Sequence, residues 1–294
     1  MAGLLLSTSM DRPGGDGEPP LLYGVAERRR DDHQAGSVRT PNRPARIEVE
    51  YIMGDLASSL VKTLNSLPVS KWGIGDISGL HPLSDEYPKA ISLLVAYTPA
   101  FRHYDERGFD SILTQALEEM HSHREALRSA LDDMDIKHLV ASWPMDEQTL
   151  TAGFSNKLAA TRAGLGWIGK NCLLVTDEYG PRVRLATVLI DADVPCAEPV
   201  TVSGCGACRV CVDACPYGCL TGADWYPGMA RDALLDAFGC LAERNKFVES
   251  IGHRHACGYC LLSCPRGRGS LDVTVGPGSQ PPDKLRLGCR RRFL

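Results

Sequence analysis

The feature that most constrains this chain is a block of cysteines between Cys205 and Cys264. The block opens at Cys205 with the pattern C-x2-C-x2-C-x3-C-P, which is the ligand spacing of a bacterial-type [4Fe–4S] run. In such a run the fourth cysteine binds the other of two clusters. A second run, from Cys257 to Pro265, reads C-x2-C-x3-C-P and lacks one ligand. Cys240, which lies in the helical-looking stretch 232–247, is the candidate for that ligand.

Eight of the nine cysteines in this block divide into two sets of four. By the cross-over rule, the predicted ligand sets are Cys205, Cys208, Cys211 and Cys264 for one cluster, and Cys215, Cys240, Cys257 and Cys260 for the other. Zinc sites also use C-x2-C pairs, but they rarely place three cysteines at successive x2 spacings before x3-C-P. A disulfide framework would need an export signal and a small fold. The spacing therefore favours two [4Fe–4S] clusters over zinc and over disulfides.

Composition places the chain among ordinary globular proteins. It has 294 residues, 23% of them charged, a net charge of −4 and 12 cysteines. The slightly acidic balance gives no electrostatic signature of a nucleic-acid binder. No apolar run approaches the roughly 18 residues that a membrane span needs, and no secretory signal is visible. A reducing, cytoplasmic location without membrane contact is expected.

The chain divides into four predicted segments. Residues 1–46 are rich in Gly, Pro, Arg and Asp without periodicity, and indicate a disordered extension or a misassigned start upstream of Met53. An α/β (α+β) domain is expected over 47–195. A double-cluster domain follows over 196–270, and 271–294 is a basic flexible tail.

Hydrophobic periodicity predicts the elements of the α/β domain. The continuous apolar run at 90–97 indicates a strand covered on both faces. His121 and His123 lie two residues apart on a helix, so they point in different directions and favour surface histidines over a metal pair. The predicted helices are 47–67, 109–134 and 156–163, and the predicted strands begin near Trp72 and span 90–97, 136–142 and 183–190.

The segment Gly164–Gly169 matches G-x-G-x-x-G. A dinucleotide-binding fingerprint needs a strand before the glycines and a helix after them. Here the predicted order is reversed, which argues against an NAD site. The glycines instead indicate close backbone approach to a neighbour or to a large flat ligand, or a glycine that ends a helix in a tight turn.

Four cysteines remain outside the predicted ligand sets. Cys172 lies in an apolar stretch that we interpret as a strand, where it would serve packing. Cys219 follows Cys215 closely, and Cys196 and Cys289 lie in predicted loops. We find no histidine or lysine neighbour that would activate any of these thiols.

Three stretches together resemble the epoxyqueuosine reductase family and its relatives, the reductive dehalogenases. These stretches are the glycine-containing segment 157–170, the strand 187–191 and the cysteine block 205–265. The resemblance covers roughly residues 48–268, and 176–185 is most similar to the shorter branch of the family.

The resemblance implies a cobalamin-binding α/β domain packed against a bacterial-ferredoxin-like module with two [4Fe–4S] clusters. In that family the clusters pass single electrons to the cobalt, which removes oxygen from an epoxide or halide from an organohalide. The residues that would approach the corrin are Gly164, Gly166, Trp167, Gly169 and Lys170. The family's acidic proton donor precedes the glycine segment, which makes Asp146 or Glu147 the candidates here.

The resulting prediction is an iron–sulfur oxidoreductase that resembles epoxyqueuosine reductase. Its partners would be an external electron donor (a ferredoxin, flavodoxin or reductase) and a small-molecule or modified-nucleoside substrate, with tRNA as a further candidate. The alternative is a ferredoxin-type electron carrier without catalysis of its own. A third interpretation, an RNA-binding module, would use the basic tail 284–294.

Overall fold

The computed structural model describes residues 54–97, 106–141, 145–251 and 257–267. Every described residue belongs to the compact unit assigned to 48–294. The predicted extension 1–46 and the basic tail 271–294, with Cys289, lie outside the described residues. The domain boundaries proposed from the sequence therefore stay predictions.

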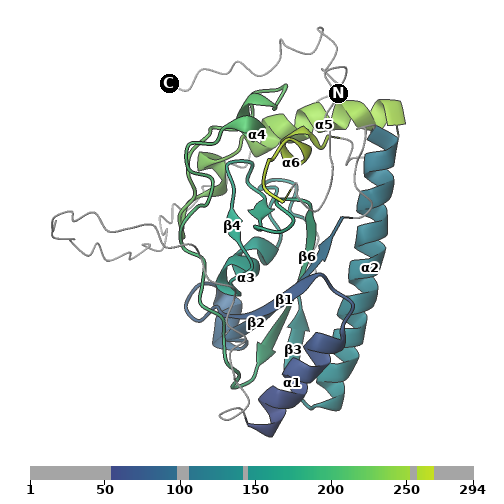
Figure 1. The fold of residues 1–294 in the computed structure, drawn as a ribbon, viewed down its shortest axis with the longest axis vertical. Coiled ribbons are helices and arrows are strands. Elements are labelled where there is room, and N and C mark those ends of the chain that lie inside the picture. Colours follow the sequence, from purple (N-terminus) through teal and green to yellow (C-terminus); the bar gives the residue numbers. More distant parts are fainter. Residues whose placement is uncertain (1–53, 98–105, 142–144, 252–256, 268–294) are drawn as a thin grey trace, which may run out of the picture. The chain divides into compact units, whose positions relative to one another are not determined.

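An antiparallel four-stranded sheet forms the centre of the α/β region (Figure 1). Every strand pairing within it is antiparallel. In spatial order the strands are β1 (Lys71–Asp76), β2 (Lys89–Ala96), β6 (Val183–Asp191) and β3 (Lys137–Val140). The longest strand, β6, therefore lies between β2 and β3, which both precede it in the chain by at least 40 residues.

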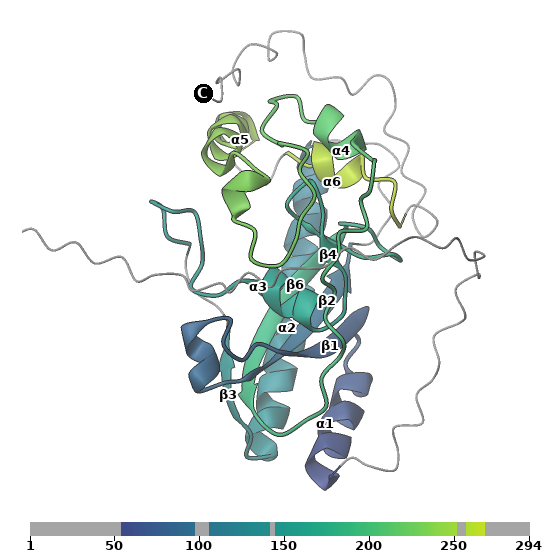
Figure 2. The ribbon, with the colours of Figure 1, turned by 90° about the vertical axis from the view of Figure 1, so that its left-hand side faces the viewer.

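Helices cover both faces of this sheet (Figures 1 and 2). On one face, Ile91 and Leu93 of β2 pack into a core with the helices α1 and α2. On the other face, Leu94 packs with Ala160 and Ala163 in and beside α3. Strand β2 is therefore buried on both sides, as its apolar run predicted. The helices are α1 (Asp55–Ser66), α2 (Glu106–Asp133) and α3 (Asn156–Arg162).

A small hairpin follows α3, and the chain then enters the cysteine-rich region. The hairpin strands are β4 (Trp167–Ile168) and β5 (Leu174–Val175), and η1 (Pro82–Asp85) is a short 3-10 helix in the β1–β2 connection. The cysteine-rich region has short helices joined by irregular chain. These are α4 (Val210–Asp213), η2 (Arg231–Ala233), α5 (Ala237–Ile251) and α6 (Tyr259–Leu262). The result is a mixed α/β fold with a cysteine-rich C-terminal region.

The interpretation of the stretch around Cys172 as a strand is wrong. Cys172 lies in the turn between β4 and β5, with a φ of 59°, which is the left-handed region that non-glycine residues rarely adopt. The turn is held by contacts that the local sequence does not encode. Asn171 donates its side-chain amide to the carbonyl of Cys260, 3.2 Å away and 89 residues later in the chain.

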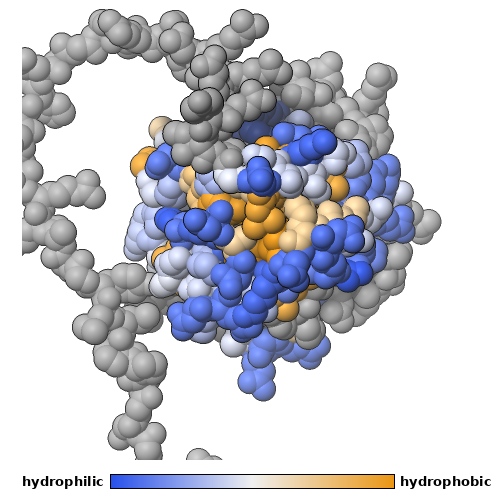
Figure 3. Space-filling view, turned by 90° about the horizontal axis from the view of Figure 1, so that it is seen from below, coloured by the Kyte–Doolittle hydropathy of each residue, from blue (hydrophilic) through white to orange (hydrophobic). Residues whose placement is uncertain are grey.

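Seen from the end of the molecule at which α1 lies, hydrophobic side chains gather in the middle of the surface and hydrophilic ones surround them (Figure 3). Leu56 of α1 is 42% exposed, which shows that the apolar side of this helix is not fully covered by described residues. Within the described ranges, no helix has the length and hydrophobicity that a bilayer crossing requires.

Candidate functional site

The two cysteine runs fold into the same local structure. Each C-x2-C-x3-C-P segment makes one helical turn, α4 in the first run and α6 in the second. The residue that begins each turn has nearly the same backbone angles, φ −127° and ψ 8° at Arg209 and φ −125° and ψ 8° at Gly258. The turns also pack against each other. The sequence repeat is thus a structural repeat, which brings the two runs face to face.

This packing gathers the eight cysteines into two neighbouring sets. Burial raises the pKa of Cys211 to about 11, and the nearby thiols of Cys264, Cys205 and Cys208 add to the rise. Burial also raises the pKa of Cys260, with further contributions from Cys257, Cys215 and Cys240. Cys211, from the first set, also contributes to the rise at Cys260, so the two sets lie next to each other. Apart from Cys211, the neighbours of each thiol belong to one of the two sets that the cross-over rule predicts. That each set binds a cluster stays a prediction.

The described cysteine thiols lie near one another, but they are not arranged as a ready-made site for a single metal ion. In the described part of the chain, no three or more His, Cys, Asp or Glu side chains are placed so that they could hold a metal ion, and none of the eleven described cysteines forms a disulfide. The donor set nevertheless suits iron–sulfur clusters, because each cubane takes four thiolates.

Hydrogen-bond donors surround the cysteine sulfurs. The indole Nε1 of Trp167 donates to Cys205 Sγ at 3.4 Å. Hydrogen bonds from the Cys219 thiol and from the backbone N–H groups of residues 217 to 219 lower the pKa of Cys215. Donors of this kind stabilise thiolates and tune the potentials of iron–sulfur clusters. Cys219, which is not a predicted ligand, therefore acts on a predicted ligand.

Buried cations accompany the set that contains Cys205. Lys170, 5% exposed, donates from Nζ to the carbonyl of Gly206 at 2.7 Å and lies 3.4 Å from a carboxylate oxygen of Asp224. Arg182 is fully buried and donates to the carbonyls of Cys264 and Arg266. Positive charge at these positions compensates the negative charge that a thiolate-ligated cluster carries.

The glycine segment packs against this set and against β5. Gly164 follows α3 with a φ of 70°, in the manner of a glycine that ends a helix. A Cβ at Gly166 would overlap the carbonyl oxygen of Val175, and one at Gly169 would approach Cys205 Sγ. The order of helix, glycines and strand is the one predicted, so the arrangement is not a dinucleotide fingerprint. The predicted contact of these glycines, and of Trp167 and Lys170, with a corrin stays a prediction.

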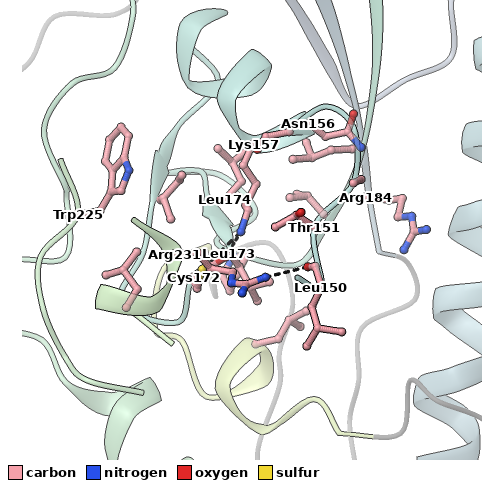
Figure 4. A pocket seen from close by; sticks show the side chains of 18 of the residues that line it. Leu150, Thr151, Asn156, Lys157, Cys172, Leu173, Leu174, Arg184, Trp225 and Arg231 are labelled. Carbon is pink, nitrogen blue, oxygen red and sulfur yellow. Dashed lines mark hydrogen bonds between the residues drawn. The ribbon is translucent and has the colours of Figure 1, made fainter. Parts of the chain in front are cut away.

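A pocket of about 660 Å³ lies beside the cysteine region. Residues from α3, the β4–β5 turn, β6 and η2 line it (Figure 4). Leu261, which follows Cys260 directly, forms part of its wall. Lys157 lies with its Nζ 3.4 Å from Cys172 Sγ. The expectation that Cys172 has no lysine neighbour is therefore wrong, because α3 brings Lys157 to it from 15 residues away.

A second pocket of about 610 Å³ adjoins the first. The two share five lining residues, namely Ala152, Phe154, Asn156, Arg184 and Leu185. His121 of α2 lines the second pocket and is exposed, whereas His123 does not line it. Together the two pockets offer room for a ligand larger than either one could hold.

The candidate proton donors Asp146 and Glu147 are not among the lining residues, although the backbone of Asp146 is hydrogen-bonded to Leu150 and Thr151 of the first pocket. Both side chains are exposed, and neither lines either pocket as the structure describes them. The Asp146 carboxylate accepts hydrogen bonds from the backbone N–H groups of Thr149 and Gln148, each at 2.8 Å, and these lower its pKa. A carboxyl group with a lowered pKa is a poor acid near neutral pH. Their role as proton donors stays a prediction.

Comparison with known proteins identifies distant relatives. No family model matches the chain. It is 29% identical over 164 residues, 53% of this chain, to the epoxyqueuosine reductase of Bacillus anthracis. An epoxyqueuosine reductase solved with an epoxyqueuosine-modified tRNA-Tyr stem loop superposes with a TM-score of 0.50 and 21% identity, over 73% of this chain and 66% of that one. The catabolic reductive dehalogenase NpRdhA gives a TM-score of 0.55 and 17% identity, over 73% of this chain and 33% of that one.

These matches make the chain a distant homologue of epoxyqueuosine reductases, with the fold of reductive dehalogenases. The match to the B. anthracis enzyme takes in 38% of that enzyme's length. The chain thus spans about two fifths of the length of that relative.

Proposed function

We propose that the protein is an iron–sulfur oxidoreductase in which two [4Fe–4S] clusters pass single electrons to an acceptor bound in the pocket beside them. The observation that carries the proposal is that the pocket adjoins the cysteine set that contains Cys260. Leu261 lines the pocket and follows the predicted ligand Cys260, while Asn171, beside the pocket residue Cys172, donates to the Cys260 carbonyl. An acceptor in the pocket would therefore lie close to the cluster of this set.

The acceptor that the relatives favour is a corrinoid. A reductive dehalogenase of this fold is associated with B12-dependent dehalogenation. The apolar walls and the two adjoining pockets suit a large, flat, mostly apolar ring. When bound, a corrinoid supplies a metal centre for the reductive removal of an oxygen or a halide. The substrate would be an epoxide, as in a modified nucleoside, or an organohalide, and an external donor such as a ferredoxin or flavodoxin would supply electrons.

The chain's own residues would perform three tasks. The two cysteine sets would hold the clusters, and Trp167 with the N–H groups near Cys215 would set how readily each accepts an electron. The walls formed by Leu173, Leu174 and Phe154 would exclude water from the acceptor. Lys170 and Arg182 would hold the loop of the first set in place through its backbone carbonyls.

Titration of the anaerobically purified protein with cobalamin, followed by absorbance, tests the proposal. We expect saturable binding of one corrinoid per chain. When the clusters are first reduced with dithionite and the excess is removed, added corrinoid should be reduced while the absorbance of the oxidised clusters returns. The variant Ala152→Trp places a bulky ring at an exposed residue shared by both pockets, and should abolish binding without loss of iron. Ser59→Trp on the exposed side of α1 is the matched control. Reducible clusters with no corrinoid binding would contradict the proposal and favour the electron carrier.

A further inference from the structure

The charges that line the larger pocket all have one sign. Lys157, Arg184 and Arg231 contribute cationic groups, and no aspartate or glutamate is among the described residues that line it. Most of the other lining side chains are apolar. The chain as a whole carries a net charge of −4. The positive charge of the pocket is therefore local, and does not follow from a generally basic protein.

The lysine has no acidic partner. Lys157 is half-buried, and its Nζ donates to the carbonyl of Cys172 at 2.7 Å and contacts Cys172 Sγ. Among the described carboxylates, none lies within ion-pair distance of it. A half-buried ammonium group without a counter-charge is costly unless an anion meets it. Because Lys157 lies on the pocket wall, a ligand bound in the pocket would supply that anion.

Arg231, which lies in η2 of the cysteine-rich region, lines the same pocket as Lys157. Its Nη1 donates to the carbonyl of Leu150 at 2.8 Å, and its other nitrogens pair with Asp232. That carboxylate is 72% exposed, so solvent screens it. In Figure 4 the side chains of Lys157 and Arg231 both end near Cys172. The third cation, Arg184, is hydrogen-bonded to Tyr97.

The backbone holds the first two cations through unusual conformations. The carbonyls that accept from Lys157 and Arg231 belong to Cys172 and Leu150, which have φ values of 59° and 53°. The described chain has one other non-glycine residue with positive φ, Asp135. Such conformations are strained for residues with a Cβ, and they cluster at functional sites. Two independent strained turns thus place two cations at one pocket.

We propose that the pocket binds an anionic group, a carboxylate or a phosphate, of an otherwise apolar ligand between Lys157 and Arg231. The apolar walls would bury the body of the ligand, and charge-assisted hydrogen bonds would hold the anion. The pocket is the one that the proposed function assigns to the electron acceptor. Anion binding itself does not depend on that function, whereas any reaction of the bound ligand does. The anion belongs either to the substrate or to the phosphodiester of a cobalamin's nucleotide tail.

Two fluorescent compounds of nearly the same shape test anion recognition in the iron-containing protein. 8-Anilinonaphthalene-1-sulfonate is an apolar anion, and N-phenyl-1-naphthylamine is its neutral counterpart. We expect Lys157→Gln to weaken sulfonate binding about tenfold, the loss of one charge-assisted hydrogen bond. Arg231→Gln should act in the same direction, and neither variant should change binding of the neutral compound. Lys62→Gln, which removes an exposed charge on α1, is the control.

Two results would overturn the inference. One is sulfonate affinity that neither pocket variant lowers more than Lys62→Gln does. The other is an equal loss of affinity for the neutral compound, which would show that the substitutions alter the apolar walls. If Lys157→Gln does not retain iron, Lys157→Arg keeps the charge and should keep sulfonate binding, and Arg231→Gln still tests the site. No step in this experiment needs electron transfer, so it can fail or succeed separately from the proposed function.

The source of the anion is resolved with cobalamin and cobinamide, which lacks the phosphodiester. If Lys157→Gln weakens cobalamin binding and spares cobinamide, the pocket binds the corrinoid phosphate. If it spares both and still weakens sulfonate binding, the anion belongs to the substrate. An equal weakening of cobinamide and cobalamin would contradict anion recognition, because the cation would then act on the ring.

Discussion

Replacing Trp167 with phenylalanine should lower the reduction potential of one cluster and leave the other unchanged. The indole Nε1 donates to Cys205 Sγ at 3.4 Å, and Trp167 is 6% exposed, so no water replaces the bond easily. A donor to a ligand sulfur stabilises the reduced cluster, which carries one more negative charge, more than the oxidised one. Phenylalanine removes the donor and leaves a smaller aromatic ring at the position where Trp167 packs on Gly204 and beneath Arg266.

The expected change in reduction potential is calculated from the free energy of one hydrogen bond. A net contribution of about 1 kcal/mol is typical, and about 1.4 kcal/mol corresponds to about 59 mV for a one-electron couple. Because the bond is present in both oxidation states, the expected fall is at most roughly 40 mV. The neighbouring cations Lys170 and Arg182 do not contact the lost N–H through any described hydrogen bond, so their effect should be unchanged.

A redox titration monitored by electron paramagnetic resonance separates the two clusters and measures each potential. Trp225→Phe is the matched control, since Trp225 is buried in the same hydrophobic cluster and the described structure gives it no hydrogen bond to a cysteine. Iron content should be equal in all three proteins. A potential in Trp167→Phe that is equal to or above that of the wild type would refute the reasoning.

Two further predictions concern stability and are measured by anaerobic denaturant unfolding. Gly166→Ala should lower the unfolding free energy by about 3 kcal/mol, because the added Cβ meets the backbone of Val175, whereas Gly54→Ala, with open space around it, should cost less than about 1 kcal/mol. A hydrogen bond from Lys89 holds the pKa of Asp76 below its ordinary value, so this carboxylate stabilises the fold above the unfolded pKa and the stabilisation is lost as pH falls. The stability difference between wild type and Asp76→Asn should therefore be constant from about pH 5 to 7 and shrink below about pH 4. A difference that grows on acidification would contradict this assignment.

Local patterns were enough to predict most of the elements. The three-and-four spacing of Leu56, Leu60 and Leu64 predicts a helix, and α1 begins at Asp55. The apolar run at 90–97 predicts β2 and its burial on both faces. The two C-x2-C-x3-C-P runs were interpreted only as ligand runs, and the structure adds that they form equivalent turns. These features depend on residues near one another in the chain.

The features that were missed depend on contacts between distant residues. The position of β6 between β2 and β3 is not written in any local pattern. The turn at Cys172 replaces a predicted strand because Asn171 is bonded to Cys260. The meeting of Lys157 with Cys172 requires both that turn and the placement of α3. The basic residues near the pocket were visible in the sequence, but their convergence was not.

Iron and acid-labile sulfide analysis of the anaerobically purified protein tests the central claim most directly. Two cubane clusters predict about eight irons and eight sulfides per chain. Cys240→Ser should reduce the iron content by about half, whereas Cys219→Ser, a change at a buried thiol outside both sets, should leave it near the wild-type value. Zinc without iron in the wild type, or full iron content in Cys240→Ser, would contradict the account.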